Sequence, residues 1–150
     1  MASGAYNKGA TDIQNRTIDW ATDTIKVMLV KSTYTFDPDH SSMTTPTTSE
    51  LDCTGYTGGF AGADRKTLAS KTITQDDTNN RSVFDAADPS AWTLGGATNN
   101  TVGGAIVYKH LTSDAASTPI FFVDFVDTAT NGSTFTLAFA ATGINYLQNG

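Results

Sequence analysis

The stretch Ile25-Lys26-Val27-Met28-Leu29-Val30 decides the fold class of this chain. Side chains alternate between the two faces of a β-strand, so residues two positions apart share a face. One face carries Ile25, Val27 and Leu29, and the more mixed face carries Lys26, Met28 and Val30. This period of two predicts a β-strand and does not fit a helix.

Shorter segments repeat the strand pattern, and turns rich in Gly, Asn and Asp separate them. The expected strands are 66–74 with Leu68 and Ile73 inward, 82–84, a strand holding Trp92 and Leu94, 105–111, 120–126, 134–139 and 144–147. The one expected helix begins at Thr45 and Pro46, since threonine caps helices and proline favours their first position. It runs through Cys53 and stops at Gly55.

These elements predict an all-β fold, because no helix is long enough to connect parallel strands. We expect an antiparallel β-sandwich or jelly-roll-like domain with one short helix, and a β-barrel is the alternative. A length of 150 residues suits one domain. Residues 1–19 are small and polar, so they are expected to form an extended N-terminal arm with one short strand near Ile13, or else a disordered tail. Residues 20–150 are expected to form a single β-sandwich domain.

Charge and composition narrow the classes of partner. The formal net charge is −6, with nine basic and fifteen acidic residues, which disfavours binding to nucleic acid and to anionic membranes. No stretch has the length and apolarity of a membrane span, and residues 1–15 lack the apolar core of a signal peptide. The single cysteine, Cys53, excludes an intrachain disulfide and is expected to be a small buried residue.

Motifs that carry chemistry are weak in this sequence. Asp37, Asp39 and His40 share a loop, but no further His or Cys accompanies them, so a solvated loop is expected there. The glycine-rich run 55–62 lacks the Lys-Ser/Thr step of a phosphate-binding loop. No Gly-x-Ser-x-Gly nucleophile motif occurs. We therefore expect no enzymatic activity, no catalytic residue, no metal and no cofactor.

Aromatic residues beside loops are the candidates for a binding role. Such residues either fix loops to the core or contact a partner subunit, where Tyr and Trp are enriched. Together with the charged residues of the arm, they give the predicted partner interface: Tyr6, Lys8, Arg16, Trp20, Tyr34 and Tyr56.

Several segments taken together resemble a family of small structural proteins of tailed bacteriophages. They are Gly4 to Gly9, Ile18 to Val30, Tyr34 to His40, Gly55-Tyr56-Thr57, Leu68 to Thr74 and Ala105 to Lys109, of which Thr22 to Val30 is the most specific. The resemblance implies a virion component without catalytic residues. It implies first a capsid decoration (cement) protein on the outer capsid surface, with a tail or baseplate component as the alternative.

A cement protein of this kind is expected to bridge subunits of the major capsid protein and to form a homo-oligomer, with a trimer favoured. The N-terminal arm would clamp the lattice by adding to a neighbour's sheet edge. A hypothesis from another class is a carbohydrate-binding β-sandwich that uses Trp20 or Trp92.

Overall fold

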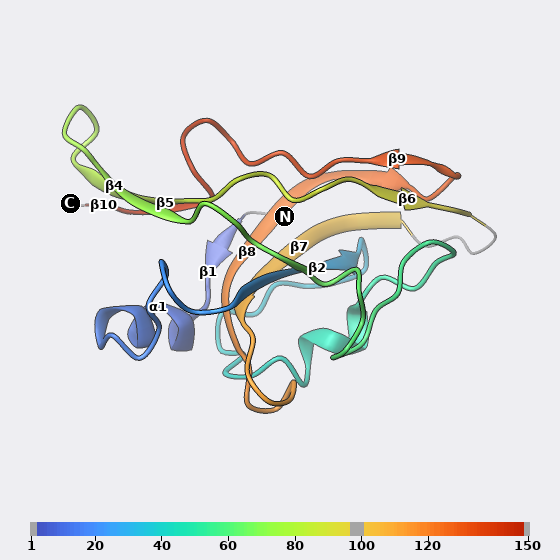
Figure 1. The fold of residues 1–150 in the computed structure, drawn as a ribbon, viewed down its shortest axis with the longest axis horizontal. Helices are drawn as coiled ribbons and strands as arrows, with labels where there is room; N and C mark the ends of the chain where they lie inside the picture. Colours follow the sequence, from blue (N-terminus) through green and yellow to red (C-terminus); the bar gives the residue numbers. More distant parts are fainter. Residues whose placement is uncertain (1–2, 97–100, 149–150) are drawn as a thin grey trace.

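The computed structural model describes residues 3–96 and 101–148, and it confirms an all-β fold with little helix. Figure 1 shows the elements in chain order. They are β1 (Gly4–Ala5), α1 (Asn7–Gln14), β2 (Ile25–Lys31), the 3-10 helix η1 (Pro46–Ser49), β3 (Lys66–Thr67), β4 (Thr72–Asp76), β5 (Arg81–Asp85), β6 (Trp92–Leu94), β7 (Thr101–Lys109), β8 (Thr118–Ala129), β9 (Ser133–Phe135) and β10 (Asn145–Gln148).

The strands form three antiparallel sheets. The largest has the order β1-β8-β7-β2-β3, the second has the order β10-β5-β4, and β6 pairs with β9. Both faces of the central sheet are buried at β2 and β7, which is why the residues between the ends of these two strands are mostly apolar. The alternation predicted for β2 is confirmed, because Ile25, Val27 and Leu29 enter one hydrophobic cluster while Met28 and Val30 enter another.

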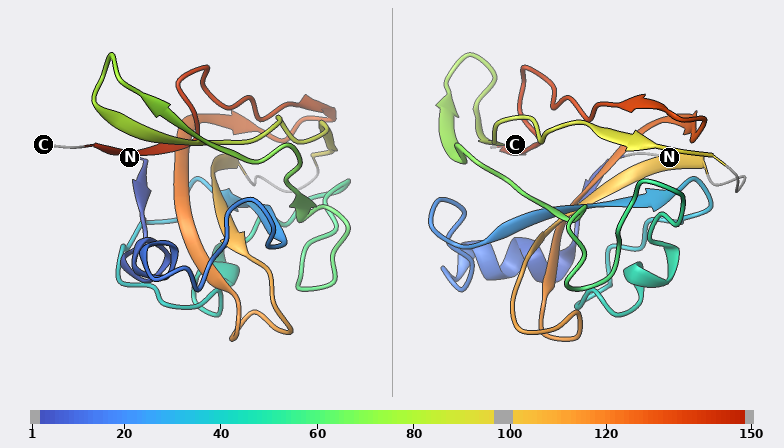
Figure 2. Two further views of the ribbon diagram at one scale, coloured as in Figure 1. Left: turned by 60° about the vertical axis from the view of Figure 1, so that its left-hand side comes forward. Right: turned by 45° about the vertical axis from the view of Figure 1, so that its right-hand side comes forward.

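The two clusters define a large core and a small core on opposite faces of the central sheet. The two smaller sheets cover the large core through residues such as Phe84, Trp92 and Leu94 (Figure 2). The small core is closed by Tyr6 and by side chains of the loop after β2: Tyr34, Phe36 and Met43. Two small sheets and a loop layer thus take the place of the second continuous sheet of a simple sandwich.

The N-terminal segment is not an extended arm, and this part of the prediction is wrong. β1 pairs with β8, and residues 7–14 form α1, which packs against β8. An ideal Cβ at Gly9 would lie 2.4 Å from the Pro119 carbonyl oxygen, so the glycine permits the close approach. The cap residue Tyr6 makes no side-chain capping bond, and the first turn carries no acidic residue, so the usual start signals are missing.

Two further segments differ from the sequence prediction. The helix expected from Thr45 to Cys53 is only the 3-10 turn η1, although Pro46 does occupy its start. The strand expected over 66–74 is divided into β3 and β4, since Ser70 adopts φ +49°. Leu68 is buried as predicted, but Ile73 is 52% exposed.

The remaining differences lie at strand ends. The strand expected over 134–139 is restricted to β9, and Leu137 beyond it is nevertheless buried. β7 begins at Thr101, before the start of the strand expected over 105–111, and residues 97–100 lie outside the described part of the chain. A Cβ at Gly104 would stand 2.5 Å from the Phe122 ring, so this glycine serves close packing and not a turn.

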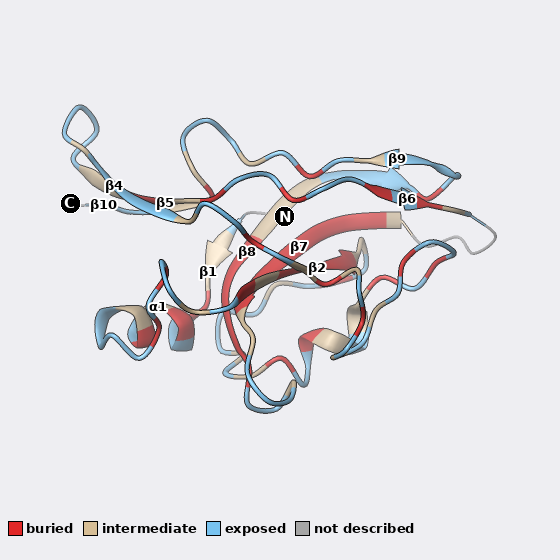
Figure 3. Cartoon of the chain, in the orientation of Figure 1, coloured by how far each residue is buried: buried red, intermediate tan, exposed pale blue. Residues whose placement is uncertain are grey.

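Burial falls off toward the periphery of the smaller sheets and the outer half of β8 (Figure 3). Within the described residues, no helix is long and apolar enough to cross a membrane.

Candidate interaction surface

The sheet β10-β5-β4 has two edges that pair with no other strand among the described residues. β5 lies in the middle, whereas β4 and β10 each leave a row of backbone N–H and C=O groups unpaired. The β4–β5 hairpin projects from the rest of the molecule in every view of Figures 1 and 2. Edges of this kind can accept a further strand.

Large apolar side chains are exposed on the same sheet. Ile73 is 52% exposed, Tyr146 46% and Leu147 42%. The register sets Ile73 and Asn145 opposite Phe84, so Ile73 and Leu147 share the face on which Phe84 enters the large core. Ile73 and Leu147 therefore continue this face outward from the core, beside the polar residues Gln75, Ser82 and Asn145.

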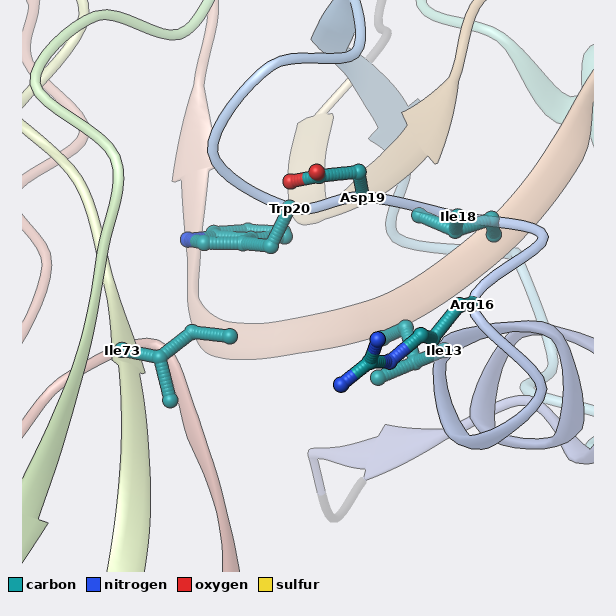
Figure 4. Close-up of a pocket in the computed structure, with 6 residues that line it drawn as sticks. All are labelled: Ile13, Arg16, Ile18, Asp19, Trp20 and Ile73. Atoms are coloured by element: carbon teal, nitrogen blue, oxygen red, sulfur yellow. The ribbon is translucent and has the colours of Figure 1, made fainter.

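A hollow of about 380 Å³ separates Ile73 from the end of α1. Figure 4 shows the side chains of Ile73 and Arg16 pointing into it from opposite sides. Ile13 lines this hollow and also a smaller apolar one beside Leu147. Ile13, Ile73 and Leu147 together are called the apolar strip below.

Arg16 owes its position to the way α1 ends. Its N–H donates to the Ile13 carbonyl at 3.1 Å, and the Thr17 N–H donates to the Asp12 carbonyl at 2.8 Å. These two bonds form a Schellman motif, in which the residue after the cap is left-handed and is usually glycine. Arg16 has φ +58°, so a cation is held in a conformation that disfavours non-glycine residues.

Asp19 also lines the hollow. Hydrogen bonds from Thr22, followed by the bond from the Ala21 N–H and the charge of Arg16, lower the pKa of the Asp19 carboxyl below its usual range. The Asp19 carboxylate is therefore ionised at neutral pH.

The structure places the six predicted interface residues in different surroundings. Tyr6 and Tyr34 lie in the small core, and Trp20 and Tyr56 lie in the large core. All four are buried in the chain itself, with Trp20 only 1% exposed although it lines the hollow. Lys8 is exposed and pairs with Asp12 on α1.

A buried ionic cluster, which the sequence analysis missed, lies under the loop 50–65. The Arg65 side chain is 0% exposed and bonds Glu50 through Nε at 2.8 Å and through Nη2 at 2.7 Å. Its Nη1 bonds Asp114 at 2.5 Å. Tyr56 donates to Glu50 at 3.2 Å, which connects the cluster to the large core. The cluster joins segments 49 residues apart, so no local pattern could have indicated it.

Arg65 and Tyr56 of this cluster keep their protons at neutral pH. Burial lowers the pKa of Arg65, but the hydrogen bonds to Glu50 and Asp114 raise it by more. The pKa of Arg65 therefore lies above its ordinary value. Burial, and then the Glu50 charge, raise the pKa of Tyr56, which holds its proton. The guanidinium of Arg65, which is bonded to two carboxylates, and the protonated phenol of Tyr56 are suited to holding a loop in place.

A second buried network ties the N-terminal segment to the loop 34–40. The hydroxyl groups of Tyr6 and Tyr34 are 2.6 Å apart, and the Tyr34 hydroxyl is 3.4 Å from His40 Nδ1. His40 Nε2 lies 3.8 Å from the Asp37 carboxylate. Burial, and then the bond to Tyr34, raise the pKa of Tyr6. The loop that was expected to be solvated is thus partly anchored in the small core.

His110 and Cys53 are two further titratable side chains, and they are partly and fully buried, respectively. His110 stacks on Phe60 with ring centroids 4.7 Å apart, and its Nδ1 is buried without a hydrogen-bond partner. Cys53 is a buried free cysteine, and burial raises the pKa of its thiol. Among the described residues, no group of three or more His, Cys, Asp or Glu side chains could hold a metal ion.

The two tryptophans named for a carbohydrate site are both buried. Trp20 is 1% exposed and donates its indole N–H to the Asp85 carbonyl at 3.1 Å. Trp92 is 2% exposed and donates to the Asp64 carbonyl at 3.1 Å. Stacking on a sugar requires an open ring face, which neither residue offers in this conformation.

Comparison with known proteins adds no relative to this description. No protein-family model, no curated protein and no solved structure matches the chain. Over the described residues, the structure defines an all-β domain of antiparallel sheets with one short α-helix. Ile73, Tyr146 and Leu147, three of its five large exposed apolar residues, lie on the sheet β10-β5-β4.

Proposed function

We propose that this chain is a non-enzymatic structural subunit of a tailed-bacteriophage particle, and that it acts as a decoration protein on the outer capsid surface. The bacteriophage assignment rests on the resemblance of the segments quoted above, of which Thr22 to Val30 is the most specific. The feature of the fold that supports an assembly role is the free β10 edge beside the apolar strip.

The contacts of β10 suit a neighbouring protein. Among the described residues its outer edge pairs with no strand over four residues, and Leu147 beside Ile13 offers an apolar anchor. An extended segment of a capsid subunit can add to such an edge, gaining backbone hydrogen bonds while an apolar side chain fills the smaller hollow. The acidic net charge of −6 suits a protein on the outside of a capsid, away from the packaged nucleic acid.

In this proposal the element that binds the capsid is β10 and not the N-terminal segment. Deleting residues up to Arg16 would remove Tyr6 from the small core, so the truncated chain would lose stability as well as any binding. A point change at an exposed residue separates the two effects. Leu147→Asp places a charge on the proposed contact, while Val126→Asp does so at an 87% exposed residue of β8 outside this sheet.

The test is localisation on particles, followed by binding of the two variants. Immunogold labelling of particles from the source of the sequence is expected to place the chain on the capsid. Rebinding to capsids stripped of it is expected for the natural chain and for Val126→Asp, but not for Leu147→Asp. Label on the tail would favour a tail or baseplate component, absence from particles would contradict both roles, and equal binding of the two variants would contradict the β10 contact.

A further inference from the structure

The free edge of β4 has a sequence that is complementary to itself. Its strand Thr72–Asp76 is preceded by Lys71 and followed by Asp77, so the two ends carry opposite charges. Lys71 makes no ion pair within the described residues, and Asp77 is exposed and bonded only to Gln75. An antiparallel partner strand with the same sequence would bring each charge opposite its complement.

We propose that a second copy of this chain pairs with β4, antiparallel and about a two-fold axis at Thr74. Thr72 then lies opposite Asp76 of the second copy, Ile73 opposite Gln75, and Thr74 opposite itself. Beyond the strand ends, Lys71 lies opposite Asp77 of the second copy. By symmetry, Asp77 lies opposite Lys71 of the second copy. The product is a continuous sheet with the order β10-β5-β4-β4-β5-β10.

Geometry selects this register. Residues directly opposite each other in a sheet share a face, so a two-fold axis must relate positions of the same parity. A register centred on Ile73 would need Ser70 opposite Asp76, but Ser70 has φ +49° and has left the strand conformation. Only the centre at Thr74 pairs the whole of β4 and joins Lys71 to Asp77.

The surroundings of β4 are consistent with pairing. Ile73 is 52% exposed, and in the dimer it packs beside the Gln75 methylene groups and diagonally to Ile73 of the second copy. The strand lacks the proline or inward-pointing lysine with which sheet edges are commonly protected. A parallel pairing would set Lys71 beside Lys71 and is disfavoured. This two-fold dimer differs from the trimer that the resemblance led us to expect. It does not depend on the proposed virion role, since it can be measured on the purified chain alone.

Exchanging the charges of Lys71 and Asp77 tests the proposal. Sedimentation over a concentration series is expected to show a monomer–dimer equilibrium for the natural chain. Lys71→Asp and Asp77→Lys each place like charges opposite one another at two sites, so each is expected to raise the dissociation constant roughly tenfold. The double variant Lys71→Asp with Asp77→Lys is expected to restore dimerisation. Lys31→Asp, which makes the same charge change on β2, is the control and is expected to leave the equilibrium unchanged.

A disulfide tests the register. In a Cys53→Ala background, Thr74→Cys puts two cysteines opposite each other at a separation a disulfide can span, whereas Gln75→Cys puts them on a diagonal. Oxidation is expected to give a covalent dimer of the first variant and little of the second. A chain that stays monomeric or forms a trimer, single charge variants that dimerise normally, or equal cross-linking of the two cysteine variants would each overturn the proposal.

Discussion

The hydroxyl groups of Tyr6 and Tyr34 lie 2.6 Å apart inside the small core, although 28 positions separate the residues in the sequence. Tyr6 precedes α1, and Tyr34 follows the end of β2. Their contact therefore fixes the N-terminal segment to the central sheet.

Removing one hydroxyl from this contact tests how far it secures the N-terminal segment. Tyr6→Phe leaves the Tyr34 hydroxyl with His40, at 3.4 Å, as its one remaining partner among the described residues, so we expect the free energy of unfolding to fall by about 1–2 kcal/mol. The control is Tyr146→Phe, because Tyr146 is 46% exposed and its hydroxyl can bond to water. Urea unfolding measures both. Equal stabilities for the two variants would mean that the Tyr6–Tyr34 bond contributes nothing.

Gly9 offers a test in which two effects have opposite signs. Helix propensity alone predicts that Gly9→Ala stabilises α1 by about 1 kcal/mol. The new Cβ, however, would meet the backbone of Pro119 at 2.4 Å and of Ile120 at 2.6 Å. Backbone atoms cannot move aside cheaply, so we expect net destabilisation of about 1–3 kcal/mol in thermal unfolding. A stabilised variant would show that α1 does not pack closely on β8.

The ionic cluster predicts a large effect from one buried cation. Arg65→Met leaves Glu50 and Asp114 without their partner, and we expect a loss of about 3–5 kcal/mol of stability. Lys8→Met removes the surface pair with Asp12, where the Lys8 side chain is 46% exposed, and should cost no more than about 0.5 kcal/mol. Chemical unfolding of both variants is the measurement. Similar losses would mean that burial does not strengthen the Arg65 contacts.

His110 makes stability depend on pH in the mildly acidic range. Burial, and then the charges of Lys26 and Arg65, lower the pKa of His110 below its ordinary value of 6.5. The unfolded chain therefore takes up this proton at a higher pH than the folded chain. The stability that comes from keeping His110 neutral is fully present above pH 6.5, and it is lost as the pH falls from there through the folded-state pKa.

Replacing the imidazole isolates this contribution. His110→Gln is expected to lose less stability between pH 7.5 and pH 5.5 than the natural chain loses, as measured by thermal unfolding at each pH. Carboxylates with lowered pKa, such as Asp19 and Asp76, act at lower pH and are unchanged in the variant. Parallel pH profiles for the two chains would exclude His110 as the source.

The sequence predicts the strands whose pattern is dominated by burial. β2 alternates cleanly because its two faces enter two different cores, and the turn 77–80 between β4 and β5 is marked by Asp and Asn. α1 was missed because its packing depends on a contact between Gly9 and β8, which lies more than a hundred residues away. A tertiary contact of this kind overrides a weak local propensity.

The candidate surface was predicted less well than the fold. Loop aromatics such as Tyr6 and Tyr56 were expected at a partner interface, but long-range hydrogen bonds draw them into the cores. Ile73 was expected inward, and it is exposed because the sheet extends past the core beyond Phe84. Apolar character alone does not tell a buried strand from one that projects beyond the core.

β8 has a consequence for the motions of the molecule. Its first residues, Thr118 to Phe122, are buried between the two cores, whereas Val126 to Ala129 are exposed. Amide protons in the inner part can exchange with solvent only when the whole domain opens, while those in the outer part exchange through local fraying. One continuous strand thus contains both amides that are strongly protected from exchange and amides that exchange easily. The outer part of the β7–β8 hairpin can open locally while the buried part stays closed.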